Sequence, residues 1–345
     1  MSSFQPPKSY TAYQWEAANT PLTRTERPWK DPEHGEVVVK VLACGVCGTD
    51  GGLHTGKLGP VQFPLIPGHE VVGDVVSIHP SVEEFKVGDR VGAPWQRAYC
   101  GSCSHCKKGV LLGCDKLMMF STGGSFDGGI AEYLRVPTSG ICHLPKDIDP
   151  AEAAPLMCAG VTVFKGMENL NIKPGSTVAI QGVGGLGHLA VQYSKAMGFR
   201  TIAISTSSDK RDLSLKLGAD IFIDESTQNA AEELQKLGGA NVIVTTAPRA
   251  EAIIRMIGGL AFEGKLLVLS LPLDAALFQP VALPGKRLSI HGWFVGTAED
   301  CCETVKYSAR HNVKVLVEKF PMAKAEEAFQ HREKAHFRAV ILPWE

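Results

Sequence analysis

Four cysteines lie within fifteen residues in the stretch CGSCSHCKKGVLLGC, residues 100–114. Cys100, Cys103, Cys106 and Cys114 follow the spacing C-x2-C-x2-C-x7-C, which lets a short glycine-containing loop wrap one tetrahedral ion, and zinc is the usual ion for four thiolates. A ferredoxin-type run has three residues before its fourth cysteine and a proline after it, so an iron–sulfur cluster is disfavoured. Because four sulfurs fill the coordination shell, we expect His105 to be merely exposed and the site to order the loop.

A glycine-rich turn follows an apolar run and precedes a segment with helical spacing. Residues 176–182 are strand-like, residues 185–198 are helix-like, and Gly182, Gly184 and Gly187 fit the pattern G-x-G-x-x-G between them. In that context the glycines permit a tight turn, and the helix start offers free N–H groups to a pyrophosphate. The residues predicted to contact a dinucleotide here are Gly182, Gly184, Gly185, Leu186 and Gly187. The alternative is a glycine-rich surface turn without a ligand.

The end of the next strand, about 20 residues later, should contact the cofactor ribose. An NAD site usually has an acidic residue there, whereas this chain has Ser205, Thr206 and Ser207, followed by Asp209, Lys210 and Arg211. Small hydroxyl groups leave room for a 2′-phosphate, and Lys210 or Arg211 can neutralise it, so the sequence favours NADP(H). The alternative is that Asp209 or a main-chain group serves NAD(H).

The chain changes character near residue 155. Before it, the β-like runs 36–44, 69–78 and 89–95 alternate with Gly and Pro, which predicts an antiparallel or partly closed β-domain. After it, apolar runs alternate with helical segments, which predicts an α/β domain with a doubly wound parallel sheet. The expected strands there are 176–182, 201–206, 221–224, 241–247, 265–270 and 287–292. A last strand, 338–344, need not belong to that sheet and could return to the first domain.

Composition limits the classes of function. The 345 residues carry a formal net charge of −1, with 44% hydrophobic and 21% charged residues. Nucleic-acid binding usually needs a basic surplus, so no nucleic-acid partner is expected. The N-terminal stretch lacks the apolar core of a signal peptide, and no run is long enough for a membrane span, which predicts a cytoplasmic protein without a membrane partner. Ten cysteines in that compartment favour metal ligands and free thiols over disulfides.

Several motifs together resemble one known family. GVCGTD at 45–50, GHE at 68–70, the four-cysteine loop, CAGVTV at 158–163 and the glycine-rich turn occur in the order seen in zinc-containing alcohol dehydrogenases of the medium-chain dehydrogenase/reductase superfamily. The resemblance covers essentially the whole chain and is strongest to the short fungal or yeast-type branch. It implies a GroES-like catalytic domain, 1–153 plus 290–345, and a Rossmann domain, 154–289. It also implies a homo-oligomer, either a dimer or a tetramer.

The resemblance assigns a second, catalytic zinc. Carried over by position, Cys47, His69 and Cys158 are its ligands, and three protein ligands leave a position open for water or substrate. Glu70, next to a ligand, is expected to approach the metal when that position is empty. Asp50 is suited to orient His69 from behind. Cys44 matches no ligand and is predicted to be a small buried residue on a strand.

The same resemblance implies hydride transfer between nicotinamide and an alcohol/aldehyde or ketone pair, with zinc polarising the substrate oxygen as a Lewis acid. Thr49 is expected to pass a proton between that oxygen and the cofactor ribose. Thr162 should lie near the nicotinamide. Arg338 matches a position that contacts cofactor phosphate, although it could instead be a surface arginine before a strand.

Two departures from the family pattern concern the proton route and the substrate pocket. Many members have a histidine five residues after the first ligand, where this chain has Gly52; His54 could replace it only if the loop is reshaped, so an exit through Thr49, ribose and water is favoured. Trp95 and Leu58 are predicted to line the pocket. Leu58, in place of an aromatic residue, together with Met118, Met119 and Phe120 suggests a roomy apolar site, although core packing explains them equally well.

Two other functions remain open from the sequence. One is reduction of an activated C=C or C=N bond in a natural product. The other is a non-catalytic protein that binds zinc and a nucleotide. The joint presence of Cys47, Thr49, His69 and Cys158 favours the dehydrogenase reaction over both.

Overall fold

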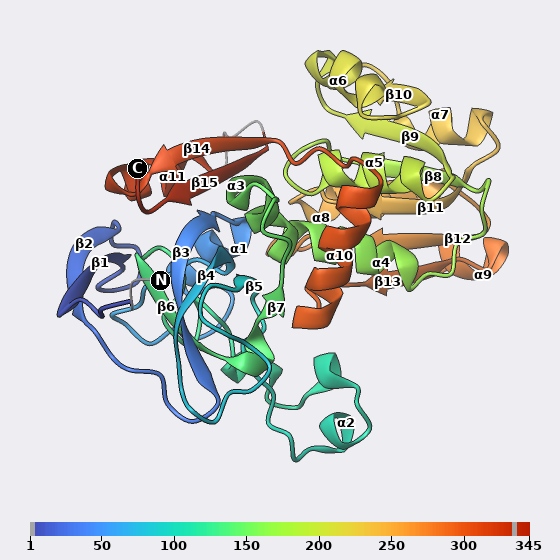
Figure 1. Ribbon diagram of the computed structural model, residues 1–345. Coiled ribbons are helices and arrows are strands. Elements are labelled where there is room, and N and C mark those ends of the chain that lie inside the picture. Colours follow the sequence, from blue (N-terminus) through green and yellow to red (C-terminus); the bar gives the residue numbers. More distant parts are fainter. Residues whose placement is uncertain (1–3, 333–336) are drawn as a thin grey trace. The chain divides into compact units, whose positions relative to one another are not determined.

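The computed structural model describes residues 4–332 and 337–345 (Figure 1). The chain divides into two compact units. The first unit contains residues up to Val161 together with Val295–Tyr307 and Val315–Glu345, and the second contains Thr162–Phe294 and Ser308–Lys314. The predicted domain boundary at 153/154 thus lies eight residues before this division, and helices α4 (Ala159–Glu168) and α10 (Ala298–Arg310) both cross it.

The first unit is built on a largely antiparallel seven-stranded sheet, counted over the described residues. Its order is β14-β15-β3-β4-β5-β7, and β6 pairs with β3 off this path. The strands are β3 (Glu36–Gly45), β4 (Glu70–Ile78), β5 (Arg90–Ala93), β6 (Tyr133–Pro137), β7 (Cys142–His143), β14 (Val317–Pro321) and β15 (Arg338–Leu342). A separate hairpin pairs β1 (Ser9–Gln14) with β2 (Thr23–Pro28). The predicted β-rich first domain is confirmed.

The C-terminal strand belongs to this sheet and not to the parallel one. In β15, Ile341 pairs with Cys44 and Val340 with Gly45 in antiparallel register, while β14 runs parallel to β15 on its other side. All five residues of β15 are buried. Short helices complete the unit: α1 (Gly48–His54), α2 (Ser104–Lys107), α3 (Pro150–Ala153) and α11 (Ala325–His331).

The second unit contains the predicted parallel sheet. The order of its strands, from top to bottom in Figure 1, is β10-β9-β8-β11-β12-β13. The chain adds strands on one side of β8 and then continues on the other side with β11, as in dinucleotide-binding folds. The strands are β8 (Thr177–Gln181), β9 (Arg200–Ser205), β10 (Ile221–Asp224), β11 (Ala240–Thr245), β12 (Leu260–Val268) and β13 (Ser289–Gly292). The helices are α5 (Gly187–Ala196), α6 (Arg211–Lys216), α7 (Ala230–Lys236), α8 (Ala250–Arg255) and α9 (Ala282–Lys286).

Each unit has its own apolar core. In the first, Trp15, Ile66 and Ile130 are essentially inaccessible, and in the second Ile202, Ile243 and Leu266 are. The ten cysteines are all free, so each unit is stabilised by the packing of its own core and not by disulfides. None of the helices among the described residues combines the length and apolarity that a membrane crossing requires.

Candidate metal centres and cofactor turn

Four potential metal ligands from three separate segments meet in the first unit. Cys47, His69, Glu70 and Cys158 each place one ligand atom within 4.8 Å of the others, and all four residues are buried. Cys47 directly precedes α1, and His69 and Glu70 lie at the start of β4. Cys158 lies between the 3-10 turn η4 (Ala154–Met157) and α4. The fold therefore gathers residues that are up to 111 positions apart in the chain.

Asp50 ties two of these segments together. Its Oδ2 accepts a hydrogen bond from the Cys47 backbone N–H at 2.7 Å, and its Oδ1 lies 3.0 Å from Nδ1 of His69. Asp50 has no exposed surface. Because Nδ1 is engaged by a carboxylate, the Nε2 lone pair of neutral His69 points toward the cysteines, and Nε2 has no hydrogen-bond partner within the described chain.

The cluster carries strongly shifted pKa values. Hydrogen bonding between the thiols, whose Sγ atoms lie 4.0 Å apart, lowers the pKa of Cys47 well below its ordinary value and raises that of Cys158. Burial disfavours the charged form of His69, but Asp50 and Cys47 together outweigh burial and raise the pKa of that imidazole well above its ordinary value. Burial also raises the pKa of Glu70 to about 8, opposed by Arg338, whose Nη2 lies 3.3 Å from Oε1.

These residues fit a zinc ion. Two thiols and an imidazole nitrogen are donors that zinc prefers, and buried polar atoms without partners are costly unless an ion satisfies them. Neither carboxylate oxygen of Glu70 has a hydrogen-bond partner in the described chain, so Glu70 provides a further oxygen donor beside the set. Gly45 makes room for this carboxylate, because a Cβ at that position would overlap Oε2 of Glu70.

The four-cysteine loop forms a second donor set in the same unit. Cys100, Cys103, Cys106 and Cys114 lie within 4.8 Å of one another, and the Sγ atoms of Cys100 and Cys106 are 3.9 Å apart. Backbone N–H groups point at the sulfurs, for example from Cys103 to Cys100 at 3.4 Å. Such bonds, with those of Ser102 first, lower the pKa of Cys100 to about 6. The pKa of Cys106 is instead raised to about 12, chiefly by desolvation, so the thiolate is favoured at Cys100 but not at every cysteine of the set. The four sulfurs still match the donors of a closed zinc site.

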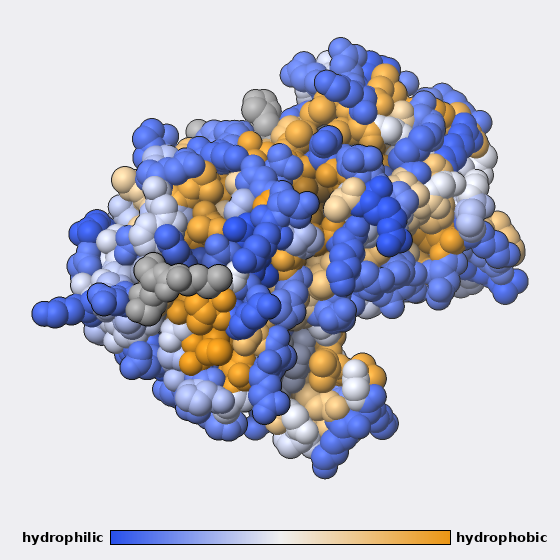
Figure 2. All heavy atoms as spheres, viewed as in Figure 1, coloured by the Kyte–Doolittle hydropathy of each residue, from blue (hydrophilic) through white to orange (hydrophobic). Residues whose placement is uncertain are grey.

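His105 is half-exposed, as expected, but it is not isolated. Its Nδ1 lies 3.3 Å from Asp115 Oδ1, and the pair comes within ligand distance of Cys103. The lobe that carries α2 exposes apolar side chains (Figure 2), among them Val110, Met118 and Met119. Met118 and Met119 are more than half exposed, which argues against the core-packing alternative for these two methionines.

The neighbours of the buried cluster bear on the expected proton route. Thr49 Oγ1 lies 3.6 Å from Cys47 Sγ. By contrast, the His54 ring stacks on Trp15 at 4.7 Å and meets Phe329 edge-on, and its Nε2 is 2.6 Å from the Thr20 carbonyl oxygen. This histidine is engaged in packing on the far side of α1, which favours Thr49 over His54 as the proton carrier.

Of the predicted pocket residues, Trp95 lies against the cluster and Leu58 against α1. The Trp95 ring meets the His69 ring edge-on at 5.0 Å, with Trp95 only 3% exposed. The Leu58 side chain covers Gly52, where a Cβ would overlap it. The glycine that replaces the family histidine therefore makes space for a leucine.

The glycine-rich turn in the second unit has the geometry of a dinucleotide cradle. Gly182 adopts φ +89°, a conformation that side chains disfavour, and a Cβ at Gly187 would overlap the Gly182 carbonyl oxygen. A Cβ at Gly184 would meet no atom of the described residues within 4 Å. Gly185 and Leu186 complete the turn, and α5 begins at Gly187. The turn thus leaves the backbone open at Gly184 and closed at Gly187.

The residues after β9 lie at the predicted ribose position. Ser205 ends the strand and is buried, Thr206 is exposed, and the Ser207 hydroxyl accepts a hydrogen bond from the Asp209 N–H at 3.2 Å. The Arg211 guanidinium lies over the Phe222 ring at 5.0 Å. Arg211 thus makes an aromatic contact, and Lys210 is the cation next to it in the chain.

Thr162 and Arg338 occupy different units. Thr162 is a buried residue of α4 in the second unit, and Arg338 starts β15 in the first. Arg338 is only 6% exposed and donates from Nη1 to the Val46 carbonyl oxygen at 3.2 Å. The alternative of a surface arginine is therefore wrong.

The sequence did not indicate how two residues contribute to these sites. Gly45 is the first residue of the GVCGTD stretch, but nothing in that stretch shows that it accommodates Glu70. Thr246 Oγ1 donates to the carbonyl oxygen of Gln181 or Gly182, at 3.0 and 3.2 Å, and so supports the glycine-rich turn from the end of β11. Only the strand order, which places β11 beside β8, could have indicated this threonine.

Comparison with known proteins agrees with this geometry. A model of the alcohol dehydrogenase GroES-like domain matches residues 33–146, and a model of zinc-binding dehydrogenases matches residues 185–310. The chain is 41% identical over 337 residues to the alcohol dehydrogenase notN of Aspergillus sp. strain MF297-2, covering 97% of this chain and 98% of that protein.

Two solved structures have the same fold over nearly their whole length. The cinnamyl alcohol dehydrogenase SbCAD4 of Sorghum bicolor is 30% identical, with a TM-score of 0.88 and 97% of each chain covered. The acetophenone reductase of Geotrichum candidum NBRC 4597, solved in complex with NAD, is 25% identical, with a TM-score of 0.86 and 99% of each chain covered.

The bond from Asp50 to His69 predicts an effect on metal retention. Asp50→Asn should weaken binding of the zinc at the buried cluster by about 10- to 100-fold, because the imidazole loses the carboxylate that fixes its tautomer. Competition with a chromogenic chelator measures the zinc affinity of the buried cluster. The zinc that the Cys47→Ser variant still binds belongs to the four-cysteine loop and is subtracted. The control is Asp74→Asn, which removes an acid of β4 that pairs with Arg90 of β5 and should leave zinc affinity unchanged. Unchanged affinity in Asp50→Asn would contradict the orienting role.

The turn geometry predicts that two glycines fail in different ways. Gly187→Ala should lower the free energy of unfolding by about 1–3 kcal/mol, because its Cβ collides with backbone. Gly184→Ala should leave stability unchanged yet weaken cofactor binding, because the added methyl group meets only the incoming phosphates. Urea denaturation and fluorescence titration with NADPH separate the two effects. Tight cofactor binding by Gly184→Ala would contradict the cradle.

Proposed function

The chain belongs to the zinc-containing alcohol dehydrogenases of the medium-chain dehydrogenase/reductase superfamily, and we propose that within it the protein is an NADP(H)-dependent reductase of aldehydes or ketones that can also act in the alcohol-oxidising direction. The observation that carries the proposal is the buried set of Cys47, His69 and Cys158. Its one unpartnered imidazole nitrogen faces two thiols while Asp50 holds the other nitrogen.

Each residue of the cluster has a proposed role. Cys47, His69 and Cys158 bind zinc, Asp50 orients His69, and Glu70 stands by as an exchangeable donor. Zinc, when bound, supplies a Lewis acid that polarises the substrate oxygen. The Thr49 hydroxyl, 3.6 Å from Cys47 Sγ, is the residue of this chain that would hold and pass the proton beside the substrate oxygen. A nicotinamide cofactor, when bound, would supply the hydride or accept it.

The preference for NADP(H) rests on the residues after β9. Ser205, Thr206 and Ser207 place hydroxyl groups where an acidic side chain would repel a 2′-phosphate, and Lys210 supplies the neutralising charge. Of two solved structures that are each 25% identical to this chain, the acetophenone reductase is in complex with NAD and a zinc-binding dehydrogenase of Sinorhizobium meliloti 1021 is bound to NADP, so relatedness at this level does not determine the cofactor. The choice follows from this chain's own residues. Thr162 and Arg338 are proposed as further contacts to the nicotinamide and a phosphate.

The substrate is proposed to be bulkier and more apolar than ethanol. Trp95 packs on His69, and Leu58 stands where short-branch relatives are expected to have an aromatic side chain. An aromatic or branched aldehyde or ketone satisfies such walls, because burying apolar surface of the substrate is favourable.

Further parts of the proposal concern the whole protein. A second zinc at Cys100, Cys103, Cys106 and Cys114 is structural. The catalytic domain comprises about 1–153 and 290–345, and the Rossmann domain 154–289. The protein works in the cytoplasm as a homo-oligomer, a dimer or a tetramer.

A turnover assay tests the reaction. The wild type should oxidise NADPH in the presence of aliphatic, aromatic or terpenoid aldehydes. Cys47→Ser should lose at least about a thousandfold in kcat/KM, since Lewis-acid polarisation contributes several kcal/mol, while NADPH binding is spared. Cys44→Ala, which changes a cysteine of β3 that is fully buried, is the matched control and should retain turnover when folded. Full activity in Cys47→Ser would remove Cys47 from the mechanism, and turnover restricted to C=C or C=N substrates would favour the alternative reaction.

Cofactor titration tests the 2′-phosphate site. NADPH should bind at least about tenfold tighter than NADH, a difference of about 1.4 kcal/mol. Lys210→Glu should remove that preference by weakening NADPH alone, whereas Lys216→Glu, an exposed lysine on α6, should not. Tighter binding of NADH by the wild type would refute the preference.

A further inference from the structure

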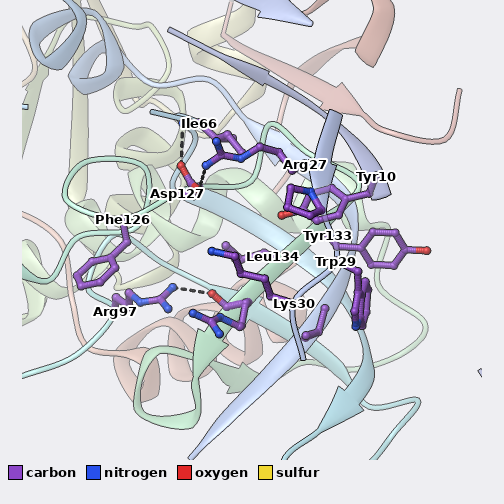
Figure 3. A pocket seen from close by; sticks show the side chains of 14 residues that line it. Tyr10, Arg27, Trp29, Lys30, Ile66, Arg97, Phe126, Asp127, Tyr133 and Leu134 are labelled. Carbon is purple, nitrogen blue, oxygen red and sulfur yellow. Dashed lines mark hydrogen bonds and ion pairs between the residues drawn. The ribbon is translucent and has the colours of Figure 1, made fainter. Parts of the chain in front are cut away.

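A cavity of about 280 Å³ lies in the first unit, apart from the residues assigned to zinc or cofactor. It opens between β2, β6 and the loops that contain Lys30, Arg97 and Phe126 (Figure 3). None of its lining residues belongs to the two predicted donor sets or to the glycine-rich turn. The proposed reaction therefore leaves this cavity without a role.

Aromatic rings form much of its wall. Trp29 and Tyr133 meet edge-on with ring centroids 5.3 Å apart, and Tyr10 meets Tyr133 in the same way at 5.7 Å. On the opposite side stands Phe126, which is 41% exposed. These rings are held by one another or by neighbouring backbone, so they offer an apolar surface to a planar ligand at little entropic cost.

The floor is cationic, and most of its charges are already paired. Arg27 forms an ion pair with Asp127, whose other oxygen accepts a hydrogen bond from the Ile66 N–H at 3.1 Å. Arg97 and Arg135 share Glu36, at 3.3 and 3.2 Å. These pairs fix the shape of the cavity and anchor its polar groups.

Lys30 is different from the three arginines. It makes no hydrogen bond or ion pair with the part of the chain that the structure describes, and its side chain extends into the cavity between the Arg27–Asp127 pair and Arg97 (Figure 3). Four cations line the cavity against one lining acid, Asp127; Glu36 and Glu33 pair with the arginines from behind, and Asp31 accepts a hydrogen bond from Trp29 Nε1 at 2.8 Å. Among the lining residues themselves, cations therefore outnumber acids beside the aromatic wall.

Arg97 supports the same conclusion. Its side chain is 8% exposed and uses Nη1 for the Arg135 carbonyl oxygen at 2.7 Å and Nη2 for Glu36, which leaves other guanidinium donors. Its guanidinium carbon also lies 4.8 Å from the Phe126 ring centroid. Burial lowers the pKa of Arg97 to about 10 in spite of Glu36, so an added anion would stabilise its charged form.

We propose that this cavity binds a small aromatic carboxylate, with its ring against Trp29, Tyr133 and Phe126 and its carboxylate between Lys30 and Arg97. A dinucleotide exceeds the volume, and an inorganic anion leaves the aromatic wall unused. A neutral aromatic molecule leaves the charge of Lys30 unpaired. Charge and shape together select a ligand with one flat apolar face and one anionic end.

Calorimetric titration with 2-naphthoate, using the zinc-loaded protein, tests this site. We expect saturable binding with a Kd below about 1 mM. The neutral amide of the same ring should bind at least about tenfold more weakly, because it cannot pair with Lys30 and Arg97. Raising the salt concentration should weaken 2-naphthoate, since part of the attraction is between partly exposed charges.

Two variants locate the binding. Lys30→Glu should weaken binding of 2-naphthoate by at least about tenfold through like-charge repulsion. Because Lys30 is exposed, the substitution should leave the fold intact. Lys86→Glu, an equally exposed lysine of the same unit outside the cavity, is the control and should bind as the wild type does. No saturation, equal binding of the amide, or equal binding by Lys30→Glu would each overturn the proposal. Binding that disappears in Cys47→Ser and persists in Lys30→Glu would place the carboxylate at the zinc cluster instead, and would also overturn it.

Discussion

The carboxylate of Asp50 is the interaction on which the buried metal cluster depends. One of its oxygens accepts a hydrogen bond from the backbone of Cys47, and the other contacts the imidazole of His69. A single side chain therefore fixes ligands from two of the three segments that meet at the cluster. Both bonds lie in the interior, where an unpaired carboxylate would be costly. This cost keeps the Cys47 backbone and the His69 ring in place beside Asp50.

The surrounding fold supplies what this carboxylate cannot. Strand β4 begins at Glu70 beside the site, and Gly45 on the neighbouring strand β3 leaves space for the glutamate. Strand β15 pairs with β3 and brings Arg338 to 3.3 Å from Glu70, so a residue near the C-terminus balances charge at the cluster. In the second unit, the order of the parallel strands places Thr246 under the glycine-rich turn. Each unit thus builds its site from strand ends that the sheet brings together.

Much of this arrangement could be predicted, because certain motifs carry their geometry with them. The spacing of Cys100 to Cys114 and the glycines after β8 are local patterns, and each set is brought together by one short segment of the chain. Strong alternation of apolar runs and helices also predicted the parallel sheet. Cys44 illustrates a subtler case: it lies fully buried on β3, as expected, although it is only three positions from Cys47 in the sequence.

Other features depended on contacts between distant segments and were beyond sequence patterns. Helix α1 contains three glycines, which disfavour a helix, and it forms because its N-terminus is capped by the Asp50 and Cys47 interactions. The strands β1, β2 and β6 were not among the β-like runs identified in the sequence, so the cavity that they help to line was not predicted either. His54 could have taken the place of the missing histidine only with a reshaped loop, and its ring is instead stacked on Trp15.

The most direct test of the buried cluster as a zinc site, separate from the four-cysteine loop, is metal analysis of the purified chain by mass spectrometry. The two donor sets predict two zinc ions per chain in the wild type and one in Cys47→Ser, with the ion at Cys100, Cys103, Cys106 and Cys114 retained. A single zinc per chain in the wild type, or two in Cys47→Ser, would contradict the account.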